Sequence, residues 1–181
     1  MRDKGADMLD KNITNAINIA LTKLLNQKLR EIGRTANMLW IGLGDDIVYV
    51  NIRGQSEIRS EYALHIQCDW EIVCNSETIV CQDDFYKAKD SSVTLPDDEE
   101  PPFGESKFDE TVANSNEIIR ANPVYVINFD TDAKGGFHLK LSNDFMIKVY
   151  PYAPSEGESW RFLMPGSDDR HLVIFESDED D

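Results

Sequence analysis

A stripe of apolar side chains at helical spacing runs from about Asn12 to Gly33, and it constrains the fold more than any other feature of the chain. Its members are Ile13, Ile17, Leu21, Leu24, Leu25, Leu29 and Ile32. Polar residues occupy the opposite face, and Gly33 is a typical residue after the end of a helix. The sequence therefore predicts a long N-terminal helix that packs on a sheet and buries Ile17, Leu21 and Leu24.

After Met38 the pattern changes to short runs rich in Ile, Val, Tyr and Trp, which favour strands. The predicted strands of the first half are Met38–Leu43, Ile47–Ile52, Tyr62–Cys68, Trp70–Cys74 and Thr78–Cys81. Those of the last third are Val124–Phe129, Phe137–Leu141, Phe145–Tyr150, Trp160–Met164 and His171–Phe175. Turn residues at Gly44, Asp45 and Asp46 predict a hairpin between the first two strands. The expected fold class is α+β, with a mostly antiparallel meander.

The length of 181 residues fits one domain. We expect a flexible N-terminus over residues 1–11 and a single α+β domain over residues 12–175. Acidic, serine and proline residues predict a long surface loop over residues 83–106. A second helix is predicted from about Ser106 to Ala121, and the acidic run at residues 176–181 is expected to be disordered.

The chain carries 34 acidic and 18 basic side chains, for a formal net charge of −16. This charge repels phosphates and anionic lipid, so neither nucleic acid nor a membrane is an expected partner. The start of the chain lacks the apolar segment of a secretory signal, and we expect a cytoplasmic protein. A basic protein partner is one explanation of the acidity, and solubility is the other.

The three cysteines are Cys68, Cys74 and Cys81. An odd number favours a reducing compartment, and we expect all three to be reduced. Together with His65 they include the residue types that bind zinc, but their spacing lacks the usual paired ligands. A cysteine nucleophile with His138 or His171 as its base also lacks a local motif. No metal, cofactor or catalytic residue is predicted.

The paired carboxylates at Asp83 and Asp84, and at Glu156 and Glu158, are expected to form a solvated face, because chance pairs are common in so acidic a chain. The three tryptophans lie in predicted strands, where most would fill the core. At least one can instead anchor a partner, as exposed Trp and Arg often do. The predicted partner-binding residues are Asp97, Asp98, Glu99, Glu100, Trp160 and Arg161.

The segment from Tyr62 to Ile72 reads YALHIQCDWEI, and Glu158 to Phe162 reads ESWRF. These segments resemble a family of small uncharacterised bacterial proteins with a strand of the type ALHIQCPWRI. Asp69 and Glu71 stand where that family usually has Pro and Arg. The resemblance implies an α+β fold without an assigned activity. Small acidic bacterial proteins of this type are often suspected to be immunity proteins that neutralise a basic toxin.

The expected function is therefore a cytosolic protein-binding module, with neutralisation of a basic toxin as its most concrete form. One alternative is an enzyme whose site is assembled from residues distant in sequence. Another is a structural or regulatory subunit. A deep pocket with a cysteine, a histidine and a carboxylate would favour the enzyme, whereas a flat acidic face around an exposed tryptophan would favour the binding protein.

Overall fold

A computed structural model describes residues 4–93, 95–96, 99–151, 157–167 and 171–175, with side chains from residue 12 onward. Within these residues, ten strands form two five-stranded antiparallel sheets. The first sheet has the order β1 (Leu29–Thr35), β2 (Met38–Val50), β3 (Ser56–Ile66), β9 (Glu158–Leu163) and β10 (Leu172–Phe175). The second has the order β5 (Glu77–Cys81), β4 (Asp69–Cys74), β8 (Phe145–Tyr150), β7 (Phe137–Leu141) and β6 (Val126–Thr131). The α+β fold class and the antiparallel pairing are confirmed.

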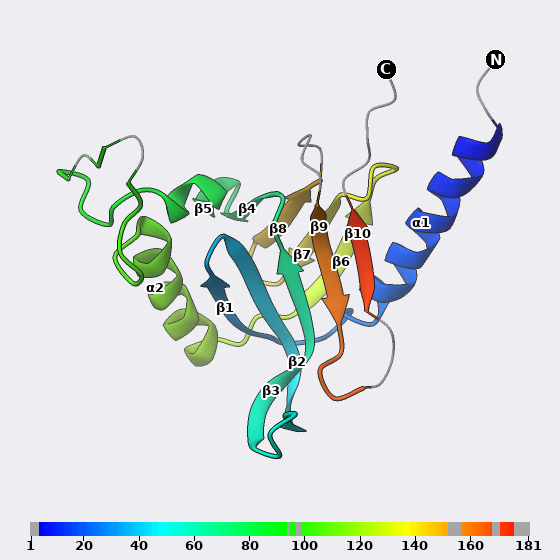
Figure 1. Cartoon of the computed structure of the whole chain (residues 1–181), viewed down its shortest axis with the longest axis horizontal. Coiled ribbons are helices and arrows are strands. Elements are labelled where there is room, and N and C mark those ends of the chain that lie inside the picture. The colour runs from blue at the N-terminus through cyan, green and yellow to red at the C-terminus, as the bar shows by residue number, and fades with distance from the viewer. Residues whose placement is uncertain (1–3, 94, 97–98, 152–156, 168–170, 176–181) are drawn as a thin grey trace.

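The two sheets pack face to face, with the first in front of the second in Figure 1. Alternate residues of each strand point inward, because side chains on a strand alternate between its two faces. Ile41 and Leu64 of the first sheet share one buried cluster with Ile72 and Ile147 of the second. The opposite face of each sheet is left outside the core.

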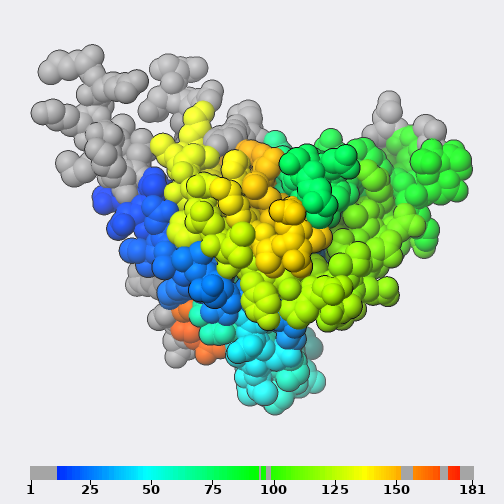
Figure 2. Space-filling view, turned by 180° about the vertical axis from the view of Figure 1, so that it is seen from behind, coloured from blue at the N-terminus to red at the C-terminus, as the bar shows by residue number. Residues whose placement is uncertain are grey.

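At each side of the two packed sheets, one helix covers the edge strand of both sheets. Helix α1 (Lys4–Thr22) contacts β10 and β6, and the Thr131 hydroxyl donates a hydrogen bond of 2.9 Å to the Asn18 side-chain oxygen. Helix α2 (Lys107–Ala121) contacts β1 and β5 at the other side. Seen from behind, the second sheet lies between the two helices (Figure 2). The helices therefore cover edges that would otherwise expose unpaired backbone groups.

The predicted burial of Ile17, Leu21 and Leu24 is confirmed, since all three are 0% exposed. The predicted extent of the helix is wrong, because α1 ends at Thr22 and the chain turns through Asn26, whose φ is 65°. In the part of the chain that the structure describes, no helix combines the length and apolar content needed to cross a bilayer.

Residues 29–35 form strand β1 instead of the end of the helix. The Leu29 backbone N–H donates to the Val124 carbonyl oxygen at 2.8 Å. A β-bulge between Leu29 and Glu31 adds a residue to the strand, so that Leu29 and Ile32 both face the core. Their separation of three residues thus imitates the spacing of a helix.

The hairpin turn predicted at Gly44, Asp45 and Asp46 is also wrong. Strand β2 continues through these residues, which form a β-bulge opposite β3, and Gly44 adopts a φ of 82°. The turn lies farther along, where the Asn51 side-chain oxygen accepts hydrogen bonds from the N–H groups of Arg53 (2.9 Å) and Gln55 (3.0 Å). The result is one long hairpin whose distal half projects beyond the sheet at the bottom of Figure 1.

The second helix is confirmed, with Ser106 as its N-cap and Phe108, Val112 and Ile119 buried. The predicted acidic loop begins with a short 3-10 helix, η1 (Gln82–Phe85), in which Asp84 and Phe85 are buried. The predicted tail at residues 176–181 lies outside the described residues. The predicted division into a flexible N-terminus and a single domain stays a prediction.

Candidate functional site

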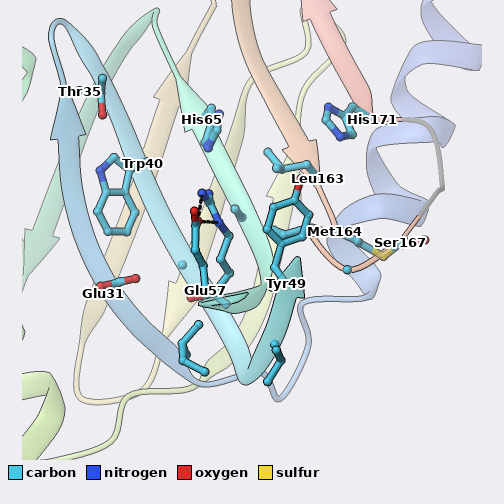
Figure 3. Close-up of a pocket in the computed structure, with 18 of the residues that line it drawn as sticks. Glu31, Thr35, Trp40, Tyr49, Glu57, His65, Leu163, Met164, Ser167 and His171 are labelled. Carbon is cyan, nitrogen blue, oxygen red and sulfur yellow. Dashed lines mark hydrogen bonds and ion pairs between the residues drawn. The ribbon is translucent and has the colours of Figure 1, made fainter. Parts of the chain in front are cut away.

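A cleft of about 870 Å³ lies on the outer face of the first sheet, on the side away from the core. Residues of β1, β2 and β3 form its floor, among them Thr35, Trp40 and His65 (Figure 3). One wall is the distal half of the β2–β3 hairpin. The other is formed by residues 163–167 at the end of β9 and by His171. Residues far apart in sequence thus meet at one concave surface.

Trp40 is the largest apolar side chain of the cleft floor, and it lies against Gly33 of the neighbouring strand. Gly33 and Trp40 are paired in the β1–β2 ladder. A Cβ atom at position 33 would lie only 2.4 Å from Trp40 Cζ2. Glycine is therefore required there for the indole to lie on the strand backbone. This packing holds the half-buried ring in place on a rigid sheet.

Glu57 and Arg59 form an ion pair in the hairpin wall. Arg59 donates to Glu57 Oε2 from Nε (3.1 Å) and Nη2 (2.6 Å), and the Asn51 amide donates to Oε1 at 2.7 Å. The hydrogen bonds from Arg59, and then the one from Asn51, lower the pKa of Glu57. The Arg59 guanidinium also lies 5.2 Å from the Tyr49 ring centre. The carboxylate is thus ionised and already paired.

Two imidazoles lie at the opposite side of the cleft. Burial lowers the pKa of His65, and the nearby positive charge of Arg161 lowers it further. The Nδ1 atom of His171 lies 3.5 Å from Nη1 of Arg161. Arg161 is also paired with Glu158, through Nε to Oε1 at 2.8 Å and through a second short contact. At neutral pH, His65 therefore presents a neutral imidazole to the cleft.

The predicted partner-binding residues that the structure describes do not share one exposed surface, because Trp160 is buried. Glu99 and Glu100 are exposed in the acidic loop, whereas Asp97 and Asp98 lie outside the described residues. Trp160 is 0% exposed, and its Nε1–H donates to the Gly135 carbonyl oxygen at 2.8 Å. It belongs to the core and cannot contact a partner of the folded protein. The next residue, Arg161, is at the surface beside the cleft.

The residues weighed for zinc binding or nucleophilic catalysis are spread over the fold. Cys68 is buried, while Cys74 and Cys81 lie on the second sheet, away from His65 on the first. His138 stacks edge-on against Tyr150 on that second sheet. Among the described residues, no three His, Cys, Asp or Glu side chains are grouped as metal ligands would be. The redox state of the cysteines stays a prediction.

The prediction of a solvated face is wrong for Asp84. Asp84 is only 2% exposed and accepts hydrogen bonds of 3.1 Å from both Lys87 and Lys107. Burial opposes ionisation of Asp84, but the bonds from Lys87 and Lys107 outweigh it and lower its pKa. Its neighbour Asp83 is exposed. Glu156 lies outside the described residues, and Glu158 is paired with Arg161.

The sequence reasoning missed the cleft itself, including Trp40 as its central side chain. The available signal was the Gly33–Trp40 pair, since a glycine opposite a large aromatic in adjacent strands is a sign of close packing. The predicted helix ends at Gly33, and a helix at this position excludes the strand pairing of Gly33 with Trp40. A second signal was the spacing of Glu57 and Arg59, because residues two apart in a strand point to the same face.

None of the comparisons with known families, curated proteins and solved structures finds a match for this chain. The resemblance to proteins with an ALHIQCPWRI-type strand therefore stays a prediction.

Proposed function

We propose that this chain is a cytosolic protein-binding module and that the cleft on the first sheet receives a side chain of its partner. The observation that carries the proposal is Trp40, which is held against Gly33 and faces an open concave surface. Tryptophan, tyrosine and arginine are the residues that most often dominate protein interfaces. Tyr49 and Arg59 line the same cleft.

The surroundings of Trp40 support recognition of a protein surface. Met38, Leu163 and Met164 add apolar area to the cleft, and Glu57 and Arg59 add a preformed ion pair. An apolar centre with polar groups around it is the usual composition of an interface. Because the Trp40 ring is already held against Gly33 of the sheet, little of its conformational freedom is lost when a partner binds.

The partner that we propose is a basic protein, and its most concrete form is a toxin that this chain neutralises. The net charge of −16 supports this choice, because an acidic molecule attracts a basic one over long range and accelerates their encounter. Occupation of the cleft would then block the toxin sterically. This role is the one suggested by the resemblance to small acidic bacterial proteins.

An enzyme built at the same cleft is the second candidate. This candidate is supported by three titratable residues that lie far apart in sequence and line the same cleft: His65, His171 and Glu57. A neutral imidazole can accept a proton near pH 7. Glu57, however, is already bound to Arg59 and Asn51. This pairing makes Glu57 a better recognition group than a proton donor, so binding is the better supported function.

The Trp40→Ala variant tests the binding proposal. We expect it to lose affinity for the partner by at least about thirtyfold, equivalent to roughly 2 kcal/mol, because the variant removes the apolar centre of the interface. The partner is first isolated with the wild-type chain as bait in an extract of the source cells. Its affinity for wild type and variant is then measured by surface plasmon resonance.

Tyr125→Ala is the matched control, since Tyr125 is an exposed aromatic residue outside the cleft. This variant should bind the partner as wild type does. If Trp40→Ala retains wild-type affinity, the cleft is not the binding surface. Recovery of acidic partners alone would reject the electrostatic part of the proposal.

The acidic loop is expected to act on the rate of encounter. Neutralising Asp97, Asp98, Glu99 and Glu100 together should slow association with the basic partner more than it speeds dissociation, because charges outside the contact area steer the approach. The wild-type association rate should fall as salt rises, since screening shortens the reach of the field. Stopped-flow kinetics over a salt series provides the measurement. An unchanged association rate in the quadruple variant would exclude the loop from recognition.

A further inference from the structure

A second, smaller hollow of about 360 Å³ lies between the β2–β3 hairpin and the C-terminal end of α2. Four cationic residues line it: Lys28, Arg30, Arg59 and Arg120. The carboxylates among its lining residues are those of Glu31 and Asp46. Figure 2 shows this part of the molecule from behind, where the hairpin projects beside the segment that follows α2. In a chain with a net charge of −16, this hollow is a local excess of positive charge.

The four cations differ in how they are paired. Arg30 forms an ion pair with Asp46, and Arg59 forms one with Glu57. Lys28 and Arg120, in contrast, make no side-chain hydrogen bond or ion pair with any described residue. Their charges are therefore available to an incoming anion. Arg30 and Arg59 retain further N–H donors, because each guanidinium has five.

Ile58 of the projecting hairpin lines the hollow, and the exposed Val48 and Val50 beside it line the cleft. Val48 and Ile58 form a cross-strand pair and are 68% and 67% exposed, while Val50 is 59% exposed. Exposed apolar groups on adjacent strands are typical of a surface that a partner covers. Through Ile58, the cationic hollow is thus continuous with exposed apolar side chains of the hairpin.

We propose that this surface binds an extended acidic segment of a partner protein, with a carboxylate in the hollow and an apolar side chain on Val48 and Ile58. Lys28 and Arg120 supply the charge-assisted hydrogen bonds. The complementarity is local, since at physiological salt charges act over about 8 Å. The net charge of −16 opposes a nucleic acid, whose phosphates are dense and extended, far more than a segment with one or two carboxylates.

The proposal goes beyond the function assigned to the cleft. It depends on Lys28 and Arg120, which line the hollow but not the cleft, whereas Val48, Ile58 and Arg59 also line the cleft. It requires neither Trp40 nor a basic partner. A partner could occupy the cleft while another segment occupies the hollow, because Glu31, Ile58, Arg59 and Ser60 separate the two and line both. Each proposal can therefore fail alone.

The test is a titration of the ¹⁵N-labelled full chain followed by NMR, with a blocked five-residue peptide of alternating valine and glutamate. We expect saturable shifts of the backbone amides of Lys28, Ile58 and Arg120, with a Kd of about 1 mM or tighter. The Lys28→Gln/Arg120→Gln variant should bind at least about tenfold more weakly, because two charge-assisted contacts are lost. A matched Lys134→Gln/Lys140→Gln variant and Trp40→Ala should bind as wild type does.

Three further probes decide between occupants. A peptide with glutamine in place of glutamate should cause no saturable shift at these amides; equal binding of this peptide would overturn the role of charge. Inorganic phosphate that binds where the acidic peptide does not would identify a small-anion site and overturn the proposal. So would tighter binding of a short oligonucleotide, or the absence of shifts with the acidic peptide. Loss of the cleft partner from Trp40→Ala is a separate result, which concerns only the proposed function.

Discussion

Replacing Asp109 with alanine is expected to lower the free energy of unfolding by about 3–5 kcal/mol, since it breaks a largely buried ion pair. The Asp109 carboxylate accepts hydrogen bonds from Arg34 Nε (3.0 Å) and Nη2 (2.9 Å) and from the Ser106 hydroxyl (2.7 Å). The Arg34 side chain is only 8% exposed. It also lies over the rings of Phe85 and Phe103. The variant would leave this charge without its partner and remove the acceptor that Asp109 provides to the backbone N–H of the N-cap Ser106.

Urea unfolding followed by circular dichroism measures the loss. Asp130→Ala is the matched control, because Asp130 forms an exposed ion pair of 3.1 Å with Lys140 and should cost at most about 1 kcal/mol. If both variants lose the same free energy of unfolding, the buried Arg34–Asp109 pair contributes no more to stability than an exposed ion pair.

The same carboxylate makes stability depend on pH in a defined direction. Burial opposes ionisation of Asp109, but the hydrogen bonds from Ser106 and Arg34 outweigh it and lower its pKa. The unfolded chain has the ordinary aspartate pKa of about 3.9. The stabilisation is therefore complete well above about pH 4 and is lost as the pH falls through the lower pKa of the folded state. Wild type should lose more stability than Asp109→Asn between neutral pH and pH of about 3.

Replacing Trp160 with alanine is expected to cost about 3–5 kcal/mol, because a fully buried indole leaves a large cavity. Trp160 packs edge-on against Phe137 at 4.9 Å between ring centres and donates to the Gly135 carbonyl oxygen. Trp40→Ala should cost far less, about 1 kcal/mol, since its ring is half-buried on the sheet surface. Thermal and urea unfolding of both variants provide the comparison.

Trp160→Phe is the control for shape, because it keeps an aromatic ring and removes the indole N–H. Its cost should lie between those of the two alanine variants. If Trp160→Ala proves no more destabilising than Trp40→Ala, the assignment of Trp160 to the core and Trp40 to the cleft would fail.

The contrast between these two tryptophans shows where sequence reasoning stops. Both lie in strand-like runs, and the face toward which each points depends on register. Trp160 and Phe162 alternate inward on β9, whereas Trp40 alternates outward between Leu39 and Ile41. A shift of one residue would exchange these faces. The local pattern predicted the strand correctly in both cases, but it could not decide which face of the strand is buried.

Strand positions were predicted well wherever alternation was regular. Residues 137–141 and 145–150 match β7 and β8, because buried and partly exposed residues alternate along β7 and along β8 from Met146 onward. The failures at residues 29–35 and 44–46 both fall on β-bulges. A bulge adds one residue and breaks the period of two, so β1 resembles a helix and β2 resembles two strands.

The cleft could not be predicted because its parts meet only through long-range pairing. Ala63 lies beside Leu163 and His65 beside Arg161 in the β3–β9 ladder. Neither pair is signalled by local sequence. The Asn51 turn had recognisable chemistry, since asparagine commonly accepts backbone hydrogen bonds from the following residues.

The β3–β9 pairing also governs the order in which the chain can fold during synthesis. Strands β1, β2 and β3 leave the ribosome early, but β3 meets its second neighbour only after residues 158–163 have emerged. Until then the long hairpin exposes an unpaired edge and the apolar face that carries Ile41 and Leu64. Nascent chains that end before β9 should therefore be especially prone to aggregate and to recruit chaperones, since exposed edges and apolar surface favour both.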